Sequence, residues 1–118
     1  NSIRKKEKIM ETKDKTCESR IDKYLAGRLE DILPMYETGE LNHEYGLCID
    51  YVCTEDHGWT GPDYARYQIG WGGPSDEFRF FADGTIEYWF MDWFDGAHRD
   101  VSEHAWAQWL REYMPTAE

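Results

Sequence analysis

The chain has 118 residues, enough for one domain that buries a core without disulfide or metal staples. Aromatic residues make up 16% of it, which excludes a disordered chain, and no apolar run has the length of a membrane span or a signal-peptide core. The net charge is −11, and such a field repels nucleic acid and anionic membranes and attracts basic partners. We therefore expect a cytoplasmic protein that binds neither nucleic acid nor membrane directly.

The acidic residues are unevenly spread along the chain. No Lys or Arg occurs between Arg28 and Arg66, although this interval is rich in acids, and the pattern repeats between Arg79 and Arg99. Too few cations are near in sequence to neutralise the first interval, so we expect its side chains to be exposed and to contact a partner. The predicted partner-binding residues are Glu30, Asp31, Glu37, Glu40, Glu44, Glu55, Asp56, Trp59 and Asp63.

Residues 1–9 differ from the rest of the chain in being basic. They carry a charge of +3, so residues 10–118 carry −14. Residues 6–10 can be back-translated to a purine-rich block that resembles a bacterial ribosome-binding sequence before a start codon at Met10. We predict that 1–9 are a leader or cloning-derived segment and that 10–118 form a single acidic domain. The alternative is a native basic arm, and the coding DNA distinguishes the two.

The first expected element is a helix from Thr16 to Leu33. Pro34 is expected to end or kink it, Gly39 to stop it, and the acidic stretch 37–44 to form a loop. The helix has one apolar stripe at helical spacing. Its members are Ile21, Tyr24, Leu25, Leu29 and Ile32.

The apolar period then changes from about 3.6 residues to about 2, which is typical of strands. Four strands are predicted, at 45–53, 64–71, 77–81 and 86–94, and Asp83-Gly84 is the tight-hairpin dipeptide between the last two. The fourth strand is apolar on both faces, which indicates a central strand or a second covering layer.

A final helix is expected from Val101 to Tyr113, with Asp100 as its N-cap and Glu103 completing a capping box. The predicted fold class is α+β: a four-stranded antiparallel meander with an N-terminal and a C-terminal helix, in the order α-β-β-β-β-α. Both helices are expected to cover the same sheet face. The residues that should then be largely buried are Leu25, Leu29, Trp106 and Leu110.

The three cysteines cannot all pair with one another. Cys48 and Cys53 are an odd number of residues apart, so on one strand they point to opposite faces. This spacing argues against both a disulfide and a metal pair, and we predict three free thiols, Cys17 included.

No motif has the spacing of a catalytic or metal site. His98 and His104 are six apart, with one before the expected helix and one inside it, so they need not converge on a metal. The Gly72-Gly73-Pro74 connection lacks the lysine of a phosphate loop. We assign no catalytic residue, no cofactor and no metal.

The six tryptophans are too many for one small core to bury fully, so some should be exposed, where Trp favours partner contacts. In composition alone, the chain resembles small phage and mobile-element proteins that inhibit host defence by presenting nucleic-acid-like negative charge. The expected function is a non-catalytic acidic protein-binding module, in its sharpest form a nucleic-acid mimic that inhibits a basic DNA- or RNA-binding partner. Two alternatives stay open: a small ligand-binding or enzymatic domain using the aromatic sheet face, and an accessory protein with a merely solubilising surface.

Overall fold

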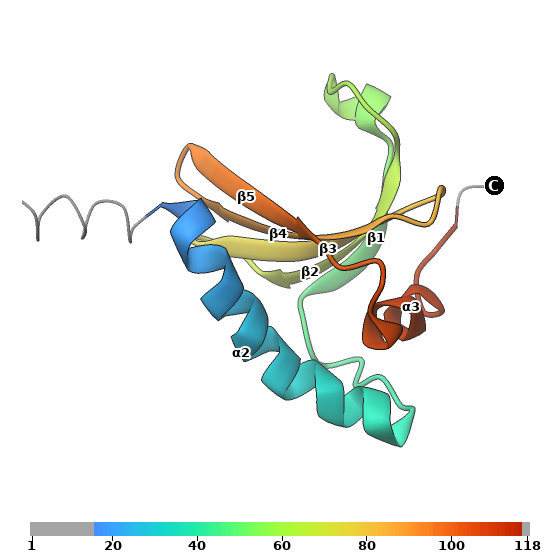
Figure 1. The fold of residues 1–118 in the computed structure, drawn as a ribbon. Helices are drawn as coiled ribbons and strands as arrows, with labels where there is room; N and C mark the ends of the chain where they lie inside the picture. The colour runs from blue at the N-terminus through green and yellow to red at the C-terminus, as the bar shows by residue number, and fades with distance from the viewer. Residues whose placement is uncertain (1–15, 117–118) are drawn as a thin grey trace, which may run out of the picture.

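The computed structural model of the protein describes residues 16–116, so the prediction for residues 1–9 lies outside the described part. Five strands form one antiparallel sheet in the order β1-β2-β3-β4-β5, each paired with the next along the chain (Figure 1). This confirms an α+β meander between two helices, with one strand more than predicted. The elements are α2 (Cys17–Thr38), β1 (Cys48–Val52), the short 3-10 helix η1 (Thr54–His57), β2 (Tyr64–Gly70), β3 (Ser75–Phe81), β4 (Ile86–Asp92), β5 (Asp95–Asp100) and α3 (Ala105–Arg111).

The extra strand, β5, corrects the predicted four-stranded sheet. The expected strand 86–94 ends at Asp92, the chain reverses at Trp93 and Phe94, and Asp95 pairs back with Asp92. Sequence patterning missed β5 because it is a polar edge strand in which Ala97 is the only buried residue. Polar, charged edges are how natural sheets avoid pairing with other chains, and they carry no apolar alternation.

Helix α2 runs further than predicted. Thr16 caps its start by accepting a hydrogen bond from the Ser19 amide, and the helix continues through Pro34 to Thr38. Pro34 removes one backbone bond but lies on the exposed side, while Ile32 is fully buried and keeps the helix on the core. The helix ends at Gly39, whose φ of 77° is a conformation that favours glycine.

Helix α3 is shorter than predicted, and its cap is different. Asp100 is the last residue of β5, and the Val101 amide still bonds to the Ile86 carbonyl of β4, so the sheet pairing continues where the helix was expected. The Asp100 carboxylate accepts from the Ser102 amide at 2.9 Å and so stabilises a turn. The helical N-cap is His104, which makes no side-chain capping bond.

Both helices cover the same face of the sheet, as predicted. Tyr24 of α2 packs on Phe90 of β4 with ring centroids 4.3 Å apart, and Trp106 of α3 meets Phe78 of β3 edge-on at 5.8 Å. Trp106 and Leu110 are buried as expected. The prediction was wrong for two residues of α2, since Leu25 and Leu29 are only partly buried against the core. The helix makes its deepest contacts through Cys17, Ile21 and Ile32.

The three cysteines are unpaired, as predicted. Cys17 is buried at the start of α2, and burial, with the nearby Asp95 carboxylate, raises the pKa of its thiol. Cys48 and Cys53 are exposed.

We expect Ellman's reagent to modify Cys48 and Cys53 rapidly in the folded protein and Cys17 only after unfolding, because the reactive thiolate must form and be reached. Absorbance traces with and without denaturant measure this, and a Cys17→Ala variant should lose only the slow phase. Three fast thiols in the native protein would contradict the burial of Cys17.

Candidate functional site

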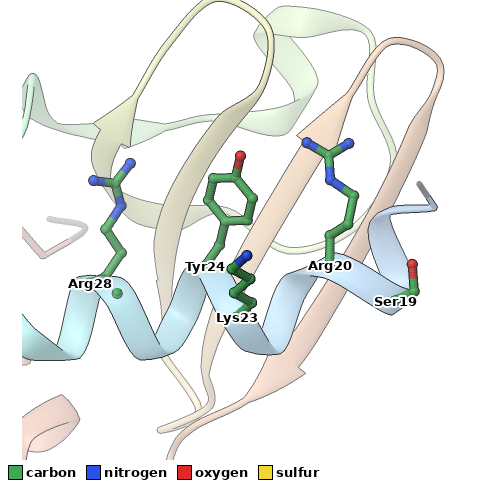
Figure 2. A pocket seen from close by; sticks show the side chains of 6 residues that line it. Ser19, Arg20, Lys23, Tyr24 and Arg28 are labelled. Atoms are coloured by element: carbon green, nitrogen blue, oxygen red, sulfur yellow. The ribbon is translucent and has the colours of Figure 1, made fainter. Parts of the chain in front are cut away.

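An open groove follows one side of α2 and has a volume of about 680 Å³. Its lining residues form two series with a four-residue spacing, one from Ser19 to Gly27 and one from Arg20 to Arg28, which places them on one side of the helix. Figure 2 shows Arg20, Tyr24 and Arg28 projecting side by side from α2 in the same direction. The groove is lined by Ser19, Arg20, Lys23, Tyr24, Gly27 and Arg28.

One end of the groove is fixed by a buried ionic network. Arg28 donates from Nε and Nη2 to the two carboxylate oxygens of Asp76 at 2.6 and 2.8 Å, and the Tyr88 hydroxyl donates to Asp76 Oδ2 at 2.6 Å. Asp76 is only 2% exposed. Burial, followed by the bond to Asp76, raises the pKa of Tyr88 far above its usual value, so the hydroxyl stays protonated and donates. Gly70 makes room for this network, because a Cβ there would lie 2.5 Å from Asp76 Oδ1.

The other end is held by Arg20. Its Nη1 donates to Asp92 Oδ2 at 2.7 Å, and its Cζ lies 5.0 Å from the Phe90 ring centroid and 5.6 Å from that of Tyr24. Lys23, between the two arginines along the helix, is exposed and makes no ion pair with any residue of the described part. The groove therefore collects three cations of an otherwise acidic chain, of which Lys23 is not neutralised.

Three exposed aromatic residues lie beside the groove, and we call them the aromatic tip: Trp71, Trp93 and Phe94. Trp93 and Phe94 form the two-residue β4–β5 turn and are 91% and 103% exposed, and Trp71, in the β2–β3 connection, is 75% exposed. The two connections lie at the same end of the sheet, since a Cβ on Gly73 would lie 3.7 Å from Asp92 Oδ1. Because Asp92, the residue before Trp93, also binds Arg20, the β4–β5 turn lies at the Arg20 end of the groove.

The sheet face opposite the helices carries a row of stacked groups across four strands. The Arg79 guanidinium lies 4.8 Å from the Tyr64 ring centroid and 4.1 Å from that of Trp89, which stacks on His98 at 4.5 Å. Arg79 is also paired with Glu77 at 2.7 Å. Within this row, Arg79 is neutralised by Glu77 and the rings stack on one another or on Arg79. The row therefore has no unpaired cation for an anionic ligand.

The predicted partner-binding residues are all exposed but fall into two groups. One group lies on the C-terminal half of α2 and the loop after it, and the other on the β1–β2 connection that contains η1. Figure 1 places these regions at opposite ends of the molecule. Two of the acids also support the fold: Asp31 accepts from the Tyr45 hydroxyl at 3.1 Å, and Asp63 from the Thr54 amide at 2.9 Å. Trp59 is half exposed and stacks on His57 at 4.5 Å.

The two histidines considered for a metal lie apart in their contacts, His98 on Trp89 and His104 on Trp106. Within residues 16–116, no three His, Cys, Asp or Glu side chains are placed to hold a metal ion. In the same range, no helix is both long and apolar enough to cross a membrane.

Sequence reasoning missed the groove and the aromatic tip. The groove is invisible in the sequence because its arginines pair with acids 48 and 72 residues away. A signal for the tip was present: Trp93 and Phe94 stand between two aspartates that interrupt the apolar run. No protein-family model matches the chain, and comparisons with curated proteins and with solved structures found no match.

Proposed function

We propose that the protein is a non-catalytic binding module whose exposed carboxylates dock on a basic surface of a partner protein. The observation that carries this proposal is that most of the cationic side chains in the described residues form ion pairs within the fold. Of the seven Lys and Arg within residues 16–116, five are held in ion pairs with carboxylates. These five are Arg20, Arg28, Arg66, Arg79 and Arg99.

Six exposed acids of the predicted partner-binding set have no cationic partner. None of them forms an ion pair with a Lys, Arg or His of the described part of the chain. Their charge therefore faces water and is available to a partner, which it attracts over a Debye length of about 8–10 Å. The acids in question are Glu30, Glu37, Glu40, Glu44, Glu55 and Asp56.

The α2 group is the stronger docking candidate of the two. Glu30, Leu33 and Glu37 follow the three- and four-residue spacing of one helix side, and Glu40 and Glu44 continue the acidic surface past the end of α2. Leu33 and the neighbouring Tyr36 are exposed, at 38% and 37%. Negative charge around apolar anchors is the pattern that a basic protein surface with an apolar centre recognises. A DNA- or RNA-binding protein is the partner class that fits, and in that case the module acts as a nucleic-acid mimic.

We expect the triple variant Glu37→Gln, Glu40→Gln, Glu44→Gln to have opposite effects on folding and binding. Relief of like-charge repulsion should raise the free energy of unfolding by about 0.5–1 kcal/mol. Loss of three carboxylates at about 0.5 kcal/mol each should weaken binding about tenfold at low salt, chiefly through the association rate. Urea unfolding measures the first effect, and surface plasmon resonance with the purified partner, first recovered from a lysate at low salt, measures the second.

The matched control is Asp83→Asn, Glu103→Gln, Glu112→Gln, which changes the net charge equally at exposed acids outside the predicted partner-binding set. It should stabilise the fold similarly and affect binding far less. Equal weakening by both variants would show that only net charge matters. Unchanged low-salt binding of the first variant would mean that this acidic surface only solubilises the protein.

A further inference from the structure

The aromatic tip has features that are unfavourable for the folding free energy of an isolated chain. Trp93 has a φ of 58°, in the left-handed region where glycine is favoured, and its indole is almost wholly exposed. Phe94 beside it is fully exposed, and Trp71 on the adjoining connection is three-quarters exposed. A cluster of large exposed aromatic residues marks an interaction surface. A two-residue hairpin turn of Asn and Gly would form more readily. We therefore infer that the two aromatic side chains at this turn contact another molecule.

The groove beside the tip is chemically complementary to aromatic rings. Cationic side chains bind over the faces of Trp and Phe, and Arg20, Lys23 and Arg28 line the groove with Tyr24 between the arginines. Arg20 already lies near two rings of its own chain. The volume of about 680 Å³ is large enough for an indole side chain. The groove next to the aromatic tip is therefore suited to bind an aromatic tip.

The charge of the chain restricts how a second copy can approach the groove. A chain with a net charge of −11 repels its own copies and anionic membranes over most of its surface. Within residues 16–116, three of the seven Lys and Arg lie in the first half of α2: Arg20 and Arg28, which pair with Asp92 and Asp76, and Lys23, which forms no ion pair there. The interval from Arg28 to Arg66 contains no other Lys or Arg. Two copies therefore meet with least repulsion at the groove end. The exposed Asp95, adjacent to the tip, accepts from the Cys17 amide through Oδ2, and its carboxylate charge can then also face Lys23 of the other copy.

Since Asp92 joins the tip to the groove within one chain, the same end of each molecule carries both a projection and a recess. A two-fold axis at that end inserts each tip into the opposite groove and closes the assembly at two copies. We propose that the chain forms a two-fold symmetric homodimer in which the aromatic tip of each copy occupies the α2 groove of the other. This goes beyond the proposed function and does not depend on it.

Sedimentation velocity over a concentration series tests the dimer on the pure protein. We expect a concentration-dependent rise to twice the 14.0 kDa chain mass. The variant Trp93→Gly, Phe94→Ser should weaken dimerisation by more than about tenfold, the effect of losing buried aromatic anchors. Because glycine fits the backbone at position 93, this variant should unfold at the same or a higher temperature when both proteins are compared at concentrations where they are monomeric, which separates lost association from lost folding.

Two matched controls locate the contact. Trp59→Ser removes an exposed tryptophan from the β1–β2 connection and should leave the dimer unchanged. Lys23→Gln in the groove should weaken it, while Thr60→Glu, which changes the net charge equally at an exposed position elsewhere, should not.

Mixing the tip variant with Lys23→Gln separates tip-to-groove from tip-to-tip contact. The mixed dimer keeps one intact tip facing one intact groove and puts both losses on the other contact, so its dissociation constant should be lower than the geometric mean of those of the two variant homodimers. No such gain would overturn the tip-to-groove arrangement, and a monomer at every concentration would overturn the dimer. Weakening by Trp59→Ser equal to that by the tip variant would place the interface elsewhere. A monomer that binds phosphatidylcholine vesicles through Trp93 would make the tip a membrane anchor instead. None of these outcomes involves a basic partner, so they leave the proposed function to its own test.

Discussion

Replacing Asp76 by alanine is expected to lower the free energy of unfolding by about 3 kcal/mol, the lower end of the range for breaking a buried ion pair. The carboxylate is 2% exposed and accepts two bonds from Arg28 and one from Tyr88. Its removal leaves the buried Tyr88 hydroxyl and a partly buried guanidinium without their acceptor. The loss is expected at the lower end of that range because the Arg28 side chain is 29% exposed and regains some water.

Asp50→Ala is the matched control, because Asp50 also accepts two bonds from one arginine, Arg66, at 2.9 and 2.6 Å. Its side chain is 40% exposed, on the sheet face without helices, so its loss should cost less than about 1 kcal/mol. Tyr88→Phe should cost about 1 kcal/mol, since it removes one hydrogen bond and leaves the Arg28–Asp76 pair intact. Urea unfolding of the three variants measures the ranking. Equal losses for Asp76→Ala and Asp50→Ala would show that burial does not strengthen the network.

The parts of the fold that were predictable are those with a strong apolar period. In β4, Ile86, Tyr88 and Phe90 alternate with other residues and all point to the core, where each is fully buried. A two-residue period fixes the face of each side chain from the sequence alone. The same holds for Trp106 and Leu110, whose four-residue spacing puts them on one buried side of α3.

The parts that failed depend on contacts between segments distant in sequence. β5 forms because β4 offers it an edge, and its own polar residues carry no strand signal. The groove depends on Asp76 and Asp92, which only the folded sheet brings to α2. Charged residues are so frequent in this chain that no sequence spacing singles out those two acids.

The acidic surface illustrates an intermediate case. The absence of cations between Arg28 and Arg66 indicated mostly exposed acids, and most of them are exposed, but Asp50 in this interval is partly buried and pairs with Arg66. Their arrangement in two regions was not predictable, since it depends on how far the β1–β2 connection extends from the sheet (Figure 1).

Leu110→Ala is expected to cost about 3–4 kcal/mol of unfolding free energy, within the range for large-to-small changes at fully buried sites. Leu110 is 0% exposed, in the short helix α3, and its truncation leaves a cavity against the sheet. Leu29→Ala in α2 is the comparison, because apolar spacing alone predicts equal burial for the two leucines. Leu29 is only partly buried, so water already meets part of its side chain and its loss should cost about 1–2 kcal/mol.

Urea unfolding followed by tryptophan fluorescence measures both leucine variants under the same conditions. A difference of at least about 1 kcal/mol is expected, because the cavity term applies fully only where no solvent can fill the space. The sign of the difference tests how the two helices share the core. If Leu29→Ala were as costly as Leu110→Ala, α2 would pack against the sheet as deeply at its middle as at Ile21 and Ile32.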